Sequence, residues 1–305
     1  MKIFNIRQMV DLIVVIVVAV LCVFLIQSAY SKEDVFSFAL TWIFVGSAAF
    51  LMLHIVKFIR LYFLLNESHI NTGTLLTLYL QCTIVNLLIP FKLGEVYRWY
   101  RIGTYIKDYK TALLSLITER FFDISVVLSI MTAGMLFFEI QINNTIIIFA
   151  LITLFALLCY NGFSPTYRYL NSYFVTKRTS SKDIIALHLL EIGADWNSHQ
   201  KKITQNKSVM ILALSIIIWA LEFVTLLCVA RSCYFKFSIS EFLAYISINV
   251  GIELASTSLF FYYVLFSLVL TSILLTISLA VGLIGKKRSC VYSGEIEDGD
   301  RCSNE

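Results

Sequence analysis

Three charged residues interrupt an otherwise apolar run in the first half of this sequence. Glu119, Arg120 and Asp123 lie about two turns inside the run Thr111–Phe138. Each charge costs roughly 2.5 to 3.5 kcal/mol near the centre of a membrane helix, so all three must be paired or hydrated. Glu119 and Asp123 are four apart, so one helical face presents two carboxylates while the guanidinium of Arg120 reaches another partner.

A second charged pair lies shortly before this run and supplies such a partner. An apolar segment ends at Pro90, and Glu95 and Arg98 follow three apart, on one face of a helix. We expect Glu95 to pair with Arg120. The residues then form either an ion-pair staple that locks two helices together, or a site for a charged ligand. A neighbouring basic cluster would neutralise a phosphate head group. This cluster comprises Lys92, Arg98 and Arg101.

The elements that position these charges must be membrane helices. The chain has 305 residues, of which 59% are apolar and only 14% charged, and its mean hydropathy is +0.82. A soluble domain is about 45 to 50% apolar and about a quarter charged. With only two prolines and twelve glycines, long helices are allowed. We therefore predict an all-α polytopic membrane protein.

Eight apolar runs are candidates for its helices. They are Val10–Tyr30, Val35–Val56, Thr74–Ile89, Thr111–Phe138, Thr145–Phe163, Ser208–Ala230, Phe242–Ser258 and Leu259–Gly285. If all eight cross, 10 basic residues lie inside and 13 outside, which opposes the cytoplasmic enrichment of Lys and Arg. If Thr74–Ile89 and Phe242–Ser258 instead re-enter and return, the counts become 20 and 3. We therefore predict six crossings plus two re-entrant segments, with up to eight helices as the alternative.

The two re-entrant runs are also the shortest, and each contains polar side chains. Gln81, Thr83 and Asn86 lie in the first, and Asn249 and Glu253 lie in the second. Interrupted segments at matching positions of two inverted halves indicate a transporter site near the midplane. We thus predict an inverted repeat with halves at about 1–138 and 145–285, although eight runs divided in two can also match by coincidence.

The remaining segments complete one transmembrane domain over 1–288. Val10–Tyr30 has the length of a retained anchor rather than a cleaved signal. In the polar stretch Ser164–Lys207, residues Lys182–Ile203 are typical of a cytoplasmic interfacial helix, or of a docking site for a partner enzyme. Residues 289–305 are expected to be a disordered polar tail. The seven scattered cysteines are expected to be reduced, with no metal-ligand spacing.

The order of the motifs resembles the membrane region of lysylphosphatidylglycerol synthases and related flippase-like proteins. The motifs are N-x-x-x-P-x-x-x-G-E-x-x-R (Asn86, Pro90, Gly94, Glu95, Arg98), E-R-x-x-D (Glu119, Arg120, Asp123) and W-x-x-E (Trp219, Glu222). The resemblance implies a bacterial inner-membrane protein that moves or handles anionic or isoprenoid lipids for the cell envelope. Where relatives carry a proline and glycine-rich stretch before a glutamate, only Gly251 and Glu253 remain here.

These observations give one candidate set of lipid- or substrate-binding residues, with no catalytic or metal ligand and no cofactor. The set comprises Asn86, Pro90, Lys92, Gly94, Glu95, Arg98, Glu119, Arg120, Asp123, Trp219, Glu222, Asn249 and Glu253. The expected partners are membrane lipids, either an anionic phospholipid or a polyprenyl phosphate, and envelope glycan or lipid-modifying enzymes, but not nucleic acid. Both termini are expected on the cytoplasmic side of the plasma membrane.

Three functions are compatible with this set. The first is a lipid translocator, which requires no covalent chemistry and therefore no enzyme activity; no soluble aminoacyl-transferase domain is apparent. The second is a polyprenyl-phosphate-dependent glycosyltransferase, which needs a carboxylate base facing the outer leaflet. The only acids of the first outer loop are Glu33 and Asp34, in a loop of about five residues. The third is an accessory subunit of an envelope-glycan assembly complex. A P-loop pattern is missing, so transport would be driven by a gradient or run downhill.

Overall fold

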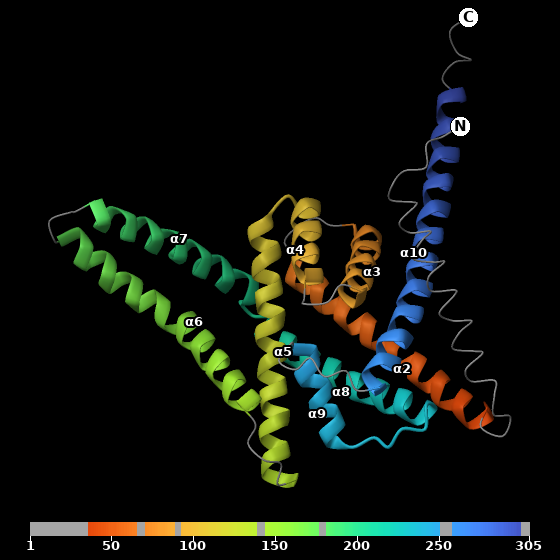
Figure 1. The fold of residues 1–305 in the computed structure, drawn as a ribbon. Helices are drawn as coiled ribbons and strands as arrows, with labels where there is room; N and C mark the ends of the chain where they lie inside the picture. Colours follow the sequence, from red (N-terminus) through yellow and green to blue (C-terminus); the bar gives the residue numbers. More distant parts are fainter. Residues whose placement is uncertain are drawn as a thin grey trace, which may run out of the picture.

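The computed structural model describes residues 36–65, 71–88, 93–138, 144–176, 181–250 and 258–299, and these contain helices and no strand (Figure 1). The helices are α2 (Phe36–Leu65), α3 (Thr72–Leu88), α4 (Leu93–Ile106), α5 (Tyr109–Phe138), α6 (Asn144–Thr176), α7 (Ser181–Thr204), α8 (Ser208–Ser232), α9 (Ile239–Val250) and α10 (Ser258–Gly299). The all-α prediction is therefore confirmed for this part of the chain.

Seven of the eight apolar runs correspond to these helices, and the run Val10–Tyr30 lies outside the described residues. The main differences are at helix ends. α2 continues nine residues beyond Val56 to Leu65. α6 continues through Pro165 to Thr176, and α10 is helical as far as Gly299, where we expected a polar tail. Apolar periodicity thus marks where the helices lie, but it underestimates helices that continue through charged or polar turns.

Three described helices are long and apolar enough to cross a membrane. They are Leu40–Leu65 in α2, Ser208–Ser232 in α8 and Leu259–Leu279 in α10. α2 packs along α8, where Phe50, Leu53 and Ile218 are almost fully buried. α5 runs through the middle of the molecule and contacts α4, α6 and α8 (Figure 1). Three helices that could each cross a membrane agree with the prediction of a polytopic membrane protein.

Helices α3 and α4 pack side by side as a hairpin (Figure 1). Gly94 makes this approach possible, because a Cβ placed there would lie 2.4 Å from the Cα of Asn86. Any side chain at position 94 would force the two helices apart. The first sequence motif therefore positions α4 against α3, and with it the charged residues that α4 carries.

A tight turn joins α4 to α5. Lys107 has a φ of 57°, and the N–H of Asp108 bonds the carbonyl of Gly103, which closes α4 as a Schellman motif does. The Asp108 carboxylate then caps α5 by accepting the N–H groups of Lys110 and Thr111, at 3.0 and 3.1 Å. Burial raises the pKa of Asp108, but a hydrogen bond from the Thr111 hydroxyl and these two N–H groups outweigh it and hold the pKa below its usual value.

Helix α7 confirms a helix over Lys182–Ile203 and has three distinct faces. One face packs on α5 and α6, where the Gln200 side chain donates to Thr118 Oγ1 at 2.5 Å. Lys110 also pairs with Asp195, which keeps the pKa of this exposed carboxyl below its usual range. A second face is exposed and apolar, at Ile185, Leu189, Ile192 and Trp196. A third is exposed and polar, at His188, Glu191, Asp195, Ser198 and Lys202.

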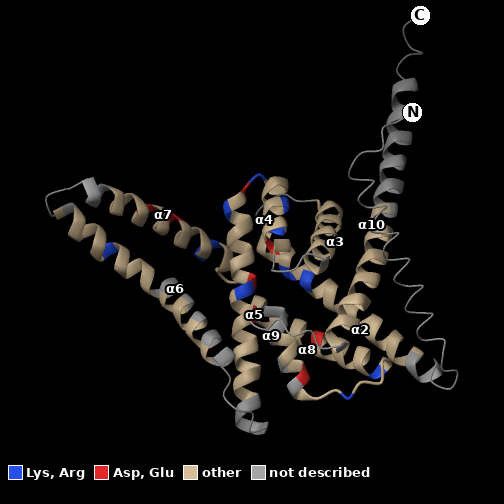
Figure 2. Cartoon of the chain, in the orientation of Figure 1, with Lys and Arg blue, Asp and Glu red and all other residues tan. Residues whose placement is uncertain are grey.

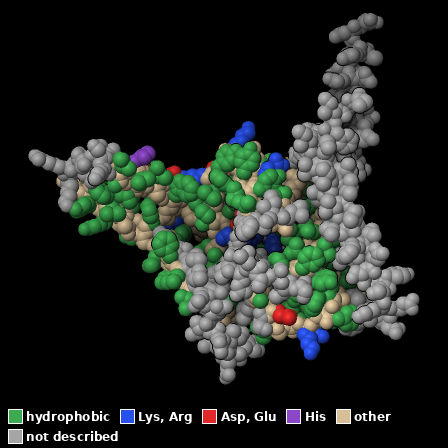
Figure 3. Space-filling model, viewed as in Figure 1, with side chains coloured by type: hydrophobic (Ala, Val, Ile, Leu, Met, Phe, Trp, Pro, Cys, Tyr) green, Lys and Arg blue, Asp and Glu red, His purple; other side chains and the backbone are tan. Residues whose placement is uncertain are grey.

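Apolar side chains also cover much of the visible surface over α6 and α7 (Figure 3). Charged side chains are sparse on the helices (Figure 2). Some lie on α6 and α7, at the turn between α4 and α5 and on the connection between α8 and α9. Others lie inside the molecule, where α2, α4, α5 and α8 meet, and these form the candidate site.

Candidate functional site

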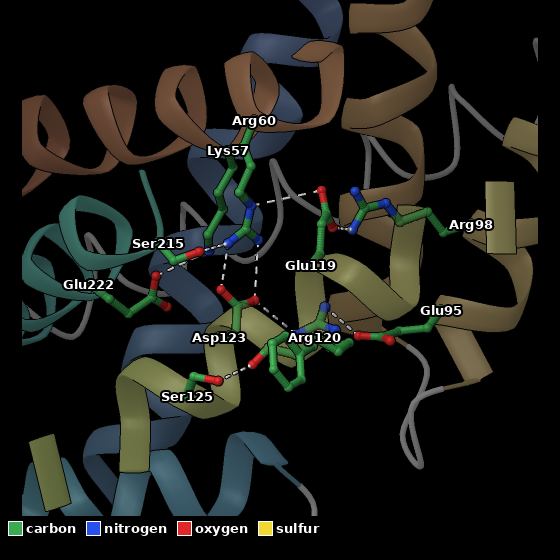
Figure 4. Close-up of polar contacts among 11 residues, drawn as sticks. Lys57, Arg60, Glu95, Arg98, Glu119, Arg120, Asp123, Ser125, Ser215 and Glu222 are labelled. Carbon is green, nitrogen blue, oxygen red and sulfur yellow. Dashed lines mark hydrogen bonds and ion pairs between the residues drawn. The ribbon is translucent and has the colours of Figure 1, made fainter. Parts of the chain in front are cut away.

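The centre of the site is a buried pair between α2 and α5. Arg60 is 4% exposed, and its two terminal nitrogens donate to the two carboxylate oxygens of Asp123, at 2.5 and 3.2 Å. Arg60 also donates to Ser215 Oγ at 2.8 Å, and its Nε lies 3.9 Å from Glu119 Oε1. One guanidinium therefore joins α2 to α5 and α8 through two-pronged recognition of a carboxylate (Figure 4).

Two further arginines extend the cluster toward α4. Arg98 Nη1 lies 2.8 Å from Glu119 Oε2, although this oxygen lacks a well-aligned hydrogen bond, so the contact is an ion pair. The pair expected between Arg120 and Glu95 is present, and Arg120 also lies 3.7 Å from Asp123. The Arg120 side chain is 42% exposed and is the most accessible of these cations.

A third buried carboxylate lies on α8. Glu222 is 5% exposed, and its Oε2 accepts a hydrogen bond from Lys57 at 3.1 Å. Its Oε1 accepts from Tyr263 at 2.6 Å and from Tyr245. Both carboxylate oxygens are therefore paired, by groups from α2, α9 and α10. Such complete pairing is what a charge in an apolar bundle requires.

The cluster is electrically balanced. Its four cations are Lys57, Arg60, Arg98 and Arg120, and its four anions are Glu95, Glu119, Asp123 and Glu222. The side chains point toward one another from four helices (Figure 4). Around them lies a pocket of about 170 Å³, smaller than the roughly 300 to 1,000 Å³ of ordinary ligand sites. The arrangement can exchange charged partners, but it offers little volume for a large ligand.

The structure brings together most of the candidate residues named from sequence. Seven of them line this pocket: Asn86, Arg98, Glu119, Arg120, Asp123, Trp219 and Glu222. Glu95 joins through Arg120, and Gly94 sets the contact between α3 and α4. Asn249 lies in α9, but its side chain is outside the described set. Pro90, Lys92, Gly251 and Glu253 also lie outside the described residues.

Two cations of the cluster were wrongly counted as loop residues. Because the apolar run ends at Val56, Lys57 and Arg60 were counted with the cytoplasmic loop, whereas both belong to α2. They are three apart and so share a helical face, and apolar residues resume directly after them. This spacing could have identified both residues as part of the helix and of the charged cluster. Removing these two residues from the count leaves 18 basic residues on the cytoplasmic side and 3 on the other, so the asymmetry persists.

The partners of Glu222 were also missed. Tyr245 and Tyr263 follow it by 23 and 41 residues and come from α9 and α10. His54 and Tyr79 line the pocket as well, joined by a hydrogen bond of 2.9 Å between His54 Nδ1 and the Tyr79 hydroxyl. Tyrosines are common in apolar runs, so their spacing alone does not mark them as hydrogen-bond donors.

A match to a known protein family covers most of the chain. Residues 8–285 match the family model described as the lysylphosphatidylglycerol synthase TM region. The chain belongs to this family. No curated protein and no solved structure shows a significant match to this chain.

The lysylphosphatidylglycerol synthase TM region is a membrane region, and the apolar helices α2, α8 and α10 agree with that assignment. The resemblance stated from the three motifs is therefore confirmed. Within the described residues, there is no group of three or more His, Cys, Asp or Glu side chains suited to a metal ion. Cys82, Cys228 and Cys233 are free thiols.

Proposed function

We propose that this protein translocates a lipid with an anionic head group, either a phospholipid or an isoprenoid phosphate, for building the cell envelope. The observation that carries this proposal is the balanced cluster of eight charges inside an apolar helical bundle. Charges at membrane depth are rare and mark substrate or ion pathways. A lipid translocator needs such a polar path for the head group, while the apolar tails remain in the bilayer.

The length of α3 supports a re-entrant segment beside this path. α3 has 17 residues, so at 1.5 Å per residue it measures about 25 Å. It is shorter than the hydrocarbon core of about 30 Å. Packing of α3 against α4 as a hairpin supports entry and return from one side. In our proposal six crossings and two such segments form an inverted repeat.

The orientation follows from the basic residues. In the six-crossing arrangement, the 18 to 3 asymmetry supports a cytoplasmic position for the turn between α4 and α5 and the opposite side for the connection between α8 and α9. In this proposal both termini are cytoplasmic and the membrane is the bacterial inner membrane.

Because the cluster is neutral, a head group binds there by exchange. An entering phosphate replaces a carboxylate on one cation, and the released carboxylate is taken up by a neighbouring cation or by the head group itself. Arg120 is the cation best suited to this step, because it is 42% exposed and its contact with Asp123 is long, at 3.7 Å. The fully buried Arg60 holds α2, α5 and α8 in place during the exchange.

Reconstituted vesicles test this proposal directly. Fluorescent phosphatidylglycerol is incorporated in both leaflets, and a membrane-impermeant reductant bleaches the outer one. Vesicles with the protein should lose more than half of the fluorescence as inner lipid emerges. Arg120→Ala should abolish the extra loss, whereas Arg231→Ala, at the exposed end of α8, should not. Protein-containing vesicles that bleach like empty ones would refute translocation of this lipid.

A further inference from the structure

A second and larger cavity lies next to the charged cluster. It has a volume of about 1140 Å³ and is bounded by α2, α3, α4 and α10. Apolar side chains form its walls, among them Leu51, Ile55 and Phe58 of α2 and Leu274 and Ile277 of α10. At this volume the cavity exceeds the usual range of small-molecule sites, about 300 to 1,000 Å³, so it can accept a ligand of lipid size.

Among the described residues, one cation faces this cavity without a carboxylate partner. Arg101 lines it together with Thr104, in the last two turns of α4. The ion pairs formed among the described residues include Arg60, Arg98 and Arg120 but not Arg101. Arg101 donates a hydrogen bond to Gln81 Oε1 at 3.4 Å and lies 6.0 Å from the centre of the Tyr97 ring. Its buried Nε has no hydrogen-bond partner in the part of the chain that the structure describes.

The two cavities thus differ in charge as well as size. The central pocket holds equal numbers of cations and anions in about 170 Å³, whereas the larger cavity has an unbalanced guanidinium in its wall. His54 and Tyr79 line both, and the hydrogen bond between them forms part of the partition. Binding of an anion is therefore more favourable in the larger cavity, because the anion displaces no carboxylate there.

We infer that this cavity is a binding site for a lipid that carries an anionic phosphate, with the phosphate on Arg101 and the apolar chain along α2 and α10. The inference deepens the proposed function and rests on it, since it places the loading site of the translocated lipid. It also changes the role expected for Arg101, from one member of a basic cluster to the residue that selects the head group.

The surroundings favour a lipid over a soluble phosphate compound. Leu51, Ile55 and Ile277 border the cavity and are 38%, 51% and 55% exposed. In a bilayer such side chains face acyl chains, so the cavity is open sideways to lipid. A bound lipid keeps its chain in an apolar environment, and its phosphate replaces the solvation that the half-buried guanidinium lacks.

Native mass spectrometry of the purified full chain tests this site with two lipids of identical acyl chains, phosphatidylglycerol and diacylglycerol, of which only the first carries a phosphate. The wild type should prefer phosphatidylglycerol. Arg101→Gln should weaken phosphatidylglycerol binding at least about tenfold, the effect of one charge-assisted hydrogen bond, and leave diacylglycerol binding unchanged. Arg101→Lys should retain most of the preference. The matched control Arg231→Gln removes an exposed guanidinium at the end of α8 and should change neither affinity.

Two further measurements separate the possible failures. Ile55→Trp fills the cavity while Arg101 remains, and it should weaken binding of both lipids; glycerol phosphate should not compete. Unchanged phosphatidylglycerol affinity in Arg101→Gln, or effective competition by glycerol phosphate, would overturn the lipid site. Vesicle assays of the same variants read translocation independently. If lipid binding does not depend on Arg101 but the wild type still translocates lipid, the proposed site is wrong and the proposed function stands. If binding depends on Arg101 but the wild type translocates no lipid, the proposed function is wrong and the site stands.

Discussion

The buried pair of Arg60 and Asp123 provides the sharpest test of how the bundle is held together. In Arg60→Met the Asp123 carboxylate loses two hydrogen bonds, of 2.5 and 3.2 Å, and keeps only Arg120 at 3.7 Å. Removing one partner of a buried pair costs about 3 to 5 kcal/mol, because the other charge stays buried and unpaired. Since Arg120 compensates in part, we expect a loss near the lower limit, about 3 kcal/mol.

The double variant Arg60→Met, Asp123→Leu should recover much of this loss. Replacing a whole buried pair by apolar side chains is often close to neutral. The double variant should therefore be at least about 2 kcal/mol more stable than the sum of the two single losses predicts. The free energy of unfolding is measured by titrating micelles of a mild detergent with a denaturing one, followed by circular dichroism.

The exposed pair of Lys110 and Asp195 serves as the control. The same two apolar replacements there should change stability little, because exposed ion pairs contribute little. If Arg60→Met costs less than about 1 kcal/mol, or if the double variant simply adds the two single losses, the cluster does not hold the helices as we argue.

Three other expectations follow from the same contacts. Gly94→Ala should destabilise the protein by about 1 to 3 kcal/mol, because its Cβ would lie 2.4 Å from a backbone atom of α3, whereas Gly162→Ala, with open space around it, should cost nothing measurable by thermal unfolding. If α7 lies on the membrane surface, a spin label at position 189, on its apolar face, should have its spectrum broadened by lipid-soluble oxygen. A spin label at position 188, on its polar face, should instead respond to a water-soluble nickel reagent, and equal responses at both positions would argue against an interfacial helix. Single cysteines at the exposed positions 73 and 107 should react with impermeant reagents from the same, cytoplasmic side, and reaction from opposite sides would restore the eight-crossing topology.

The sequence predicts much of this site because charges in apolar runs are costly and therefore informative. Glu119, Arg120 and Asp123 require partners, and the position of Glu95 on the preceding helix made it a candidate for Arg120. Arg60 escaped notice because it lies near the end of an apolar run, where a basic residue is equally typical of a loop. The tyrosines that bind Glu222 come from helices distant in sequence, and only tertiary packing brings them to it.

The charge balance of the cluster also explains why stability and transport should depend on different arginines. Arg60 is 4% exposed and binds Asp123 through two nitrogens, so exchanging its partner would expose a buried charge to an apolar environment. Arg120 is 42% exposed, and water or a head group can replace its carboxylates at much lower cost. Substitution of Arg120 should therefore stop lipid movement with little loss of stability, whereas substitution of Arg60 should destabilise the bundle before any effect on transport can be measured.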